Sequence, residues 1–401
     1  MGSAQGKLRA VDRGRLTGDP LDYTILNSSL GVGIDHGIEL VSRILARYIM
    51  RRLVLHIGYF KAGSTSIQSY CLAHRQQLSQ QGILFPVQPG NEVNKAHANL
   101  AMSLLDQSFP ASRRFDPQRL TFPKLSEQLK TTNEDVVILS SEAFVHLVTS
   151  PESIAALETF AFDNDLTVDV IVFLRPQHLL INSRYTEKAK ALRTRQCFVP
   201  FLRKQVDYPP LQYDAHLKPW KGSSRMRLVP VPFTHNRLKP DLMKSFFTAA
   251  NLEKRIATLL RTNGIDIANT SPGPMTLRAC LTMARRLGGR RHWSSKGLGL
   301  EAGRKLARRL CIVGKERGWD DIQFNGLDNR RRDLVQDRFS ASNNKLAQRY
   351  WSADWEEIFY EDYKRDFAPN ELRLKDMTPE DVQIIDRLVQ ETAREENVDL
   401  D

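Results

Sequence analysis

Four short apolar runs, separated by helix-like segments, constrain the fold of this chain more than any other feature of its sequence. The runs are rich in valine, isoleucine and leucine and occupy Leu53–Ile57, Val136–Leu139, Val168–Leu174 and Leu228–Val231. Strands that alternate with helices form parallel sheets, because each helix returns the chain to the edge where the next strand begins. The sequence therefore predicts an α/β fold, a three-layer parallel sheet flanked by helices.

Two strand-to-helix units can be followed in more detail. After the first run, the segment from 64 to 81 places its apolar residues on one helical face, and Gly82 supplies a stop. After the third run, Arg175-Pro176 precedes a second helix, because proline suits the first helical turn. We expect that helix to reach about Arg193.

The strand pattern stops at about residue 271, which suggests three segments. Residues 1–50 carry glycines and scattered charges, and a basic amphipathic stretch runs from Val41 to Arg52. We expect a mobile leader with one short helix there. Residues 51–270 then form the α/β core, and residues 271–401 form a helical C-terminal portion.

Composition excludes several classes of protein. The 401 residues with 41% hydrophobic content are enough to bury a full core. The four cysteines show no CxxC pair or metal-ligand spacing, so we expect neither a disulfide framework nor a metal site. No apolar run approaches the roughly 20 residues of a membrane span, and no secretory signal is evident. The sequence predicts a soluble, cytoplasmic protein, with weak membrane-surface contact through residues 41–52 left open.

The net charge of +12 is concentrated in one part of the chain. From Arg278 to Arg332 there are 15 Lys and Arg against 5 Asp and Glu. This excess should attract anions. The stretch lacks interleaved aromatic residues and any DNA-reading motif, so we expect no specific nucleic-acid partner. Solvated helix faces explain the charge equally well.

The first apolar run leads into a loop with the features of a phosphate site. The segment HIGYFKAGSTSIQ, residues 56–68, has glycines at 58 and 63, Lys61 inside the loop, and hydroxyl residues that open a helix. Glycines let the backbone approach an anion, and consecutive amides with a helix N-terminus bind it. A Walker A loop would place its lysine directly after the second glycine. Here Lys61 precedes Gly63 by two residues, so the loop is of another kind.

This loop resembles the 5'-phosphosulfate loop of sulfotransferases that use 3'-phosphoadenosine-5'-phosphosulfate, in the bacterial glycan-type form commonly written HIGxPKTGTTSLQ. The departures are Phe60 for proline, Ala62 for threonine, and Ser64 for threonine, the last of which keeps the hydroxyl. A second match lies in residues 168–190, where Arg175 ends a strand and Ser183 follows eight residues later. This spacing is similar to the family's 3'-phosphate motif, in which an arginine fork and a hydroxyl suit a phosphate.

Three shorter segments extend the resemblance over about residues 52–360. VVILSSEAF at 136–144 resembles the family's middle strand and Ser-Ser-Glu turn, YDAHLKPW at 213–220 its Tyr-Asp-x-x-Leu-x-x-Trp element, and LAQRYWSADWEEIF at 346–359 a late helix. The resemblance implies a P-loop-NTPase-like sulfotransferase fold and in-line transfer of a sulfuryl group to a hydroxyl or amine of a carbohydrate or glycan-like acceptor. The portion 271–401 is then a candidate acceptor-side subdomain.

The resemblance also implies roles for individual residues. Lys61 would stabilise charge on the leaving phosphate, and no metal would be required. The donor, which leaves as adenosine 3',5'-bisphosphate, would be held by Lys61, Ala62, Gly63, Ser64, Thr65, Ser66, Arg175 and Ser183. A base must accept the proton of the acceptor. His97 is the first candidate, Glu142 the second and Glu92 the third, and a purely structural role for His97 stays open.

Two other functions stay open from the sequence. A P-loop nucleotide kinase or other phosphotransferase shares the strand-loop-helix arrangement, but it predicts Gly-Lys-Ser/Thr and a magnesium-binding acid, and it leaves Arg175 and Ser183 unexplained. A noncatalytic polyanion-binding protein would act through the basic stretch, with salt-sensitive binding and no turnover. Such binding could coexist with catalysis if the acceptor is itself an anionic polysaccharide.

Overall fold

A computed structural model describes residues 50–59, 62–87, 96–105, 115–222, 224–234, 242–262, 271–288 and 300–400. They belong to one structural unit, Met50–Asp401. The predicted leader, Lys61 and Glu92 lie outside the described residues. At the end of the amphipathic stretch, Arg51 and Arg52 belong to the first strand.

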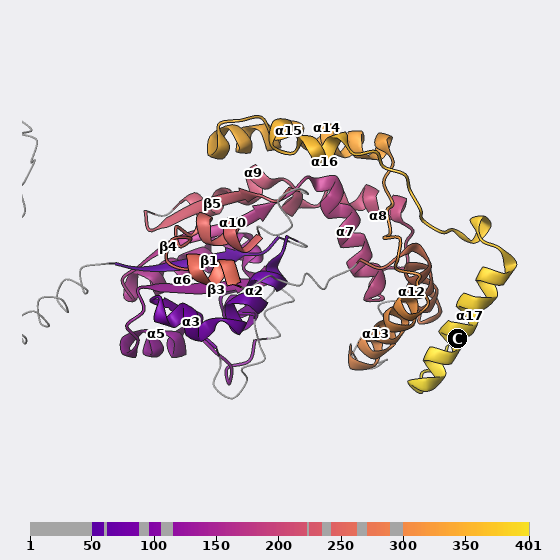
Figure 1. The fold of residues 1–401 in the computed structure, drawn as a ribbon, viewed down its shortest axis with the longest axis horizontal. Helices are drawn as coiled ribbons and strands as arrows, with labels where there is room; N and C mark the ends of the chain where they lie inside the picture. Colours follow the sequence, from indigo (N-terminus) through magenta and orange to yellow (C-terminus); the bar gives the residue numbers. More distant parts are fainter. Residues whose placement is uncertain are drawn as a thin grey trace, which may run out of the picture. The chain divides into compact units, whose positions relative to one another are not determined.

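Within the described residues, five parallel strands form one sheet, which confirms the predicted α/β fold (Figure 1). The strands are β1 Arg51–Ile57, β2 Ile83–Leu84, β3 Val136–Ser141, β4 Leu166–Leu174 and β5 Met226–Pro232. Their order is β2-β3-β1-β4-β5. All four predicted strands are present, whereas the two residues of β2 are too few to show a period in the sequence.

The strands read as continuous apolar runs because helices cover the sheet and bury both strand faces. Every residue of β3 is buried, and so is every residue of β1 from Leu53 onward. The helices that contact the strands include α2 Ser64–Ala73, α4 Ala98–Leu104, α6 Pro151–Asp163 and α10 Leu242–Ala249. The sheet and these helices share one hydrophobic core.

The two predicted strand-to-helix units are present with shifted ends. The helix expected over residues 64–81 is interrupted at His74, which separates α2 from α3, Arg75–Gln80. Gly82 follows in the left-handed region with φ 72°, as its stop role requires. The second helix, α7, spans Gln177–Lys190 and ends before Arg193, because Leu192 turns into the left-handed region at φ 55°.

Short elements complete the part of the chain around the sheet. These are α5 Phe122–Thr131, η3 Glu142–Thr149, α8 Phe198–Gln205, η4 Pro209–Leu211, α9 Tyr213–His216, η5 Lys218–Lys221 and α11 Ala257–Thr262. None of the helices in the described ranges has both the length and the apolar composition that a bilayer crossing requires.

The predicted helical C-terminal portion is confirmed over residues 271–288 and 300–400. It contains α12 Pro274–Arg286, α13 Leu300–Glu316, α14 Asn329–Trp351, α15 Trp355–Ile358, α16 Tyr360–Lys364, η7 Leu374–Asp376 and α17 Pro379–Glu395. Helices α12, α13 and α17 pack on one another around a second core (Figure 1). Side chains of α14 and α15, such as Phe339, Leu346 and Trp355, belong instead to the core of the sheet. The division at residue 271 stays a prediction.

Candidate active site

Three groups predicted from the sequence lie at one edge of the sheet, where β3, β1 and β4 end. They are the Ser-Ser-Glu turn, the loop after β1 and Arg175. β1 lies between the other two strands, with Ile57 opposite Ser141 and His56 opposite Ile171. From β1 the chain continues to β2 on one side of the sheet, and from β4 it continues to β5 on the other side. The topological switch point therefore lies between β1 and β4. Ligands of open α/β sheets bind outside such a point. The loop after β1 and Arg175 after β4 flank it, on strands about 4.8 Å apart.

Gly58 marks where the loop, the start of α2 and the Ser-Ser-Glu turn meet. A Cβ atom at Gly58 would lie 2.4 Å from Ser64 Oγ and 2.8 Å from Glu142 Cγ. The Gly58 amide donates to the Ser141 carbonyl at 3.2 Å. Ser64 and Glu142 therefore both lie against the same backbone position, and a larger residue there would displace them.

The N-terminus of α2 has the properties of an anion site. Gly63 caps it at φ 80°, and a Cβ there would lie 2.5 Å from Leu242 Cδ2. Among the described residues, no side chain caps this helix, and the buried Ser64 Oγ has no hydrogen-bond partner. An anion would satisfy both the first amides of the helix and this hydroxyl. The predicted Ala62 is fully buried, Thr65 is exposed and Ser66 is half-buried.

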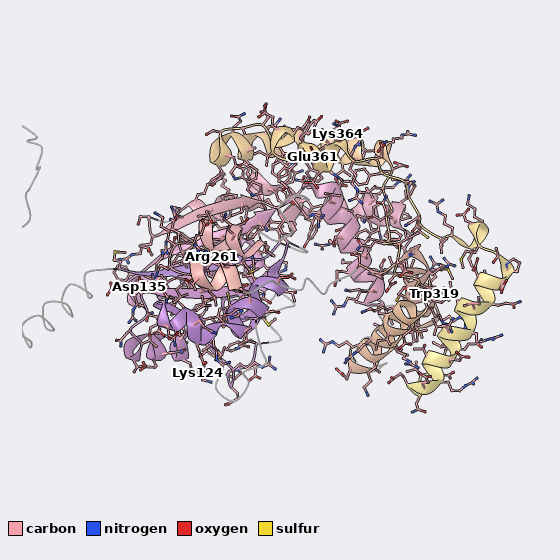
Figure 2. The ribbon with its side chains drawn as sticks, in the orientation of Figure 1. Lys124, Asp135, Arg261, Trp319, Glu361 and Lys364 are labelled. Carbon is pink, nitrogen blue, oxygen red and sulfur yellow. The ribbon has the colours of Figure 1, made fainter. Side chains whose placement is uncertain are left out.

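Arg175, at the end of β4, lies in a partly compensated environment. Burial lowers the pKa of its guanidinium, and the nearby carboxylate of Asp362 opposes that shift. Asp362 is itself buried, whereas its neighbours Glu361 and Lys364 on α16 are exposed (Figure 2). Ser183 lies on α7, half-buried and seven residues beyond the N-cap residue Pro176, which corresponds to about 10 Å of helix. The structure thus places Arg175 at the edge and Ser183 farther along α7.

Tyr213 connects four of the segments that the sequence analysis singled out. Its hydroxyl donates to the Arg175 carbonyl at 2.9 Å, and its ring centroid lies 5.1 Å from that of Tyr59 and 5.9 Å from that of Trp355. The next residue, Asp214, forms an ion pair with Arg349 of α14. The segments around residues 59, 175, 213 and 355 therefore form one packed unit at this edge.

His97 is engaged by backbone groups at both ring nitrogens. Its Nδ1 accepts the Ser140 amide at 3.0 Å, so Nε2 carries the proton and donates to the Pro86 carbonyl at 2.8 Å. Burial lowers the pKa of His97 to about 4. A cavity of about 20 Å³, room for roughly one water, adjoins it. In this arrangement the His97 lone pair is already committed to the backbone of β3.

A second histidine supports the same strand end and was not singled out from the sequence. His56 Nδ1 lies 2.8 Å from Ser140 Oγ, and Gln68 Nε2 donates to that hydroxyl at 3.2 Å. Burial lowers the pKa of His56 to about 3. His56 and His97 therefore hold Ser140 through its hydroxyl and its amide respectively, and both are neutral near pH 7.

Glu142 differs from His97 in being open to solvent. It is exposed at the start of η3, where Ser141 Oγ accepts the Ala143 amide at 3.1 Å. Of the two candidate bases in the described residues, Glu142 is therefore the one that a molecule arriving from solvent can reach. It also lies against Gly58, next to Ser64.

The buried histidines make stability depend on pH in a defined direction. Their ordinary pKa is 6.5, and the folded value for His97 is about 4. Between pH 6.5 and 4 the unfolded chain binds a proton that the folded chain does not, so stability is fully present above pH 6.5 and falls with acidification. We expect His97→Asn, which keeps an acceptor for the Ser140 amide, to make this slope shallower by about 1.4 kcal/mol per pH unit. Urea unfolding at pH 7, 6 and 5 measures it, and an unchanged slope would contradict the assignment.

Comparison of the chain with protein-family models, with curated proteins and with solved structures gives no significant match.

Proposed function

We propose that this protein is a sulfotransferase that moves a sulfuryl group from 3'-phosphoadenosine-5'-phosphosulfate to a hydroxyl or amine of a glycan-like acceptor, on a P-loop-like sulfotransferase fold. One observation carries the proposal. Among the described residues, the buried Ser64 hydroxyl has no hydrogen-bond partner and no side chain caps the N-terminus of α2. This helix start lies on one side of the switch point, and Arg175 follows the neighbouring strand on the other side. Two anion-binding groups at adjacent strand ends suit a nucleotide with phosphates at both 5' and 3' positions.

The residues at the edge fit this donor. Because Gly58 and Gly63 lack a Cβ, Ser64 and Glu142 pack against the backbone at residue 58 and Leu242 packs against it at residue 63. The amides and hydroxyls from Gly63 to Ser66 would hold the 5'-phosphate, and Arg175 with Ser183 would hold the 3'-phosphate. When bound, the donor supplies the sulfuryl group itself. Lys61, which follows β1 in the loop, would neutralise charge that develops on the departing phosphate oxygen.

We propose Glu142 as the base, because it is exposed beside Ser64 while the His97 lone pair binds the Ser140 amide. Glu142→Gln should lower kcat about 10²- to 10³-fold, since the amide keeps the shape of the side chain but cannot accept a proton. Affinity for adenosine 3',5'-bisphosphate should stay within about twofold. The matched control is Glu127→Gln, a change on the exposed surface of α5. If His97→Asn loses more turnover per folded molecule than Glu142→Gln, the base is His97.

Ser64→Ala tests whether the Ser64 hydroxyl binds the nucleotide or only stabilises the fold. An unsatisfied buried hydroxyl costs free energy, so its removal should leave the ligand-free protein equally stable or more stable by about 1 kcal/mol. Affinity for adenosine 3',5'-bisphosphate should fall about tenfold, the effect of losing one hydrogen bond to a charged group. Ser141→Ala is the control, because this hydroxyl caps η3 and its loss should lower the melting temperature. Thermal unfolding with and without nucleotide measures both effects. A lower melting temperature with unchanged affinity would remove Ser64 from the site.

The activity itself is tested with radiolabelled phosphosulfate donor and a panel of glycans, lipids and small phenols. We expect donor-dependent labelling of at least one glycan. The panel is repeated with ATP labelled in its γ-phosphate. Labelling from ATP in place of phosphosulfate would assign the protein to the phosphotransferases, and labelling from neither donor would contradict the proposal.

A further inference from the structure

A cavity of about 240 Å³ lies between the C-terminal end of α7 and one face of α13, away from the edge described above. It is lined by Lys190, Ala191, Arg193, Arg304, Ala307, Arg308 and Cys311. The four residues from α13 recur at spacings of three, one and three, which places them on a single helical face. Four of the seven lining residues are lysine or arginine, and the other three are small.

The positive charge of this cavity is only partly compensated. Lys190 forms an ion pair with Glu187 at 2.5 Å, and Arg304 one with Glu301 at 3.7 Å. Both acids lie three residues before their partner on the same helix. Within the described part of the chain, Arg193 and Arg308 form no ion pair. Two guanidinium groups are therefore available to an anionic ligand, and their fork geometry suits sulfate and carboxylate.

The lining also limits which class of molecule can carry the anionic group that binds here. Among the described residues, no aromatic side chain lines the cavity, so none of them offers a stacking partner to a nucleic-acid base there. Arg175 lies two residues before the start of α7, which spans 14 residues from Gln177 to Lys190. At 1.5 Å per residue, the two ends of α7 are roughly 20 Å apart. A ligand that reaches both places must be an extended chain.

We propose that this cavity binds sulfate or carboxylate groups of an anionic polysaccharide, which is thereby held as the acceptor. The identification as acceptor rests on the sulfotransferase function proposed above, whereas the binding does not. The basic stretch noted in the sequence then has a defined binding face, the side of α13 that carries Arg304 and Arg308.

Binding is tested with the full-length protein and a heparin-derived decasaccharide in the absence of donor. Arg193→Ala/Arg308→Ala should weaken binding at least tenfold and reduce the slope of log affinity against log salt by about 2, one for each cation removed. The matched control is Lys375→Ala/Arg387→Ala, which removes two exposed cations elsewhere in the helical portion. Equal losses in the two double variants would show diffuse attraction and overturn the proposal.

Cys311 gives a second readout from inside the cavity. A hydrogen bond from the Cys280 thiol, aided by Lys190, lowers the pKa of Cys311, so it should react readily with iodoacetamide. Saturating decasaccharide should slow its alkylation at least fivefold, with half-buried Cys197 as the internal reference in the same digest. Unchanged alkylation of Cys311, or equal protection by a single-stranded oligonucleotide of the same charge, would contradict a polysaccharide site.

The two proposals can fail separately. Lys61→Ala should bind the decasaccharide as the wild type does, because Lys61 belongs to the donor loop. Protection of Cys311 without any donor turnover would keep the polysaccharide site and reject the sulfotransferase. Donor turnover without protection of Cys311 would do the reverse.

Discussion

Replacing Lys61 with alanine should lower the rate of sulfuryl transfer about 10²- to 10³-fold, the usual effect of removing a group that stabilises developing charge in an active site. Lys61 stands in the loop after β1, and the described residues on either side of residues 60–61, Tyr59 and Ala62, are buried at the carboxyl edge of the sheet. We expect the protein to remain folded.

The measurement is single-turnover transfer from radiolabelled phosphosulfate, with adenosine 3',5'-bisphosphate affinity measured in parallel. Affinity should fall much less than the rate, since the charge that Lys61 opposes is largest when the sulfur–oxygen bond lengthens. Lys130→Ala, on the exposed surface of α5, is the matched control. A rate within twofold of wild type would exclude Lys61 from the mechanism.

Arg175→Lys should weaken binding of adenosine 3',5'-bisphosphate about 10- to 100-fold and leave adenosine 5'-phosphate binding within about threefold. A hydrogen bond to a charged group contributes about 1.5–3 kcal/mol, and lysine lacks the arginine fork. Lysine is preferred to alanine here because it keeps a positive charge near the buried carboxylate of Asp362.

Calorimetry with the two nucleotides measures this difference. Arg227→Lys is the matched control, because Arg227 also pairs with a buried acid, Asp169, at 2.8 Å, but at the beginning of β5, away from the carboxyl edge. If both nucleotides lose affinity equally in Arg175→Lys, Arg175 contacts the 5'-phosphate or acts through the fold. In either case the assignment to the 3'-phosphate is wrong.

The strands and their parallel arrangement could be predicted from the sequence because strands buried on both faces are continuous apolar runs, which differ plainly from helical periodicity. Convergence of Gly58, Glu142 and Arg175 at one edge then follows from topology. The ends of the helices were predicted less accurately than the strands. The break at His74 and the left-handed turn at Leu192 depend on tertiary packing, which the spacing of apolar residues in the sequence does not indicate.

The supporting residues of the site could not be found in this way. Tyr213 and Asp362 reach Arg175 from segments far along the chain, and nothing in their local sequence indicates that contact. The same holds for His97, because its local sequence does not indicate that both ring nitrogens bind the backbone, at Ser140 and Pro86. Long-range contacts of this kind require the fold itself.

The central claim is that one nucleotide bridges the N-terminus of α2 and Arg175. A crystal structure of the protein with adenosine 3',5'-bisphosphate tests it most directly. The account predicts the 5'-phosphate within hydrogen-bond distance of the Ser64 hydroxyl and the neighbouring amides, and the 3'-phosphate within reach of the Arg175 guanidinium. A nucleotide held by only one of these groups, or bound elsewhere in contact with neither, would contradict it.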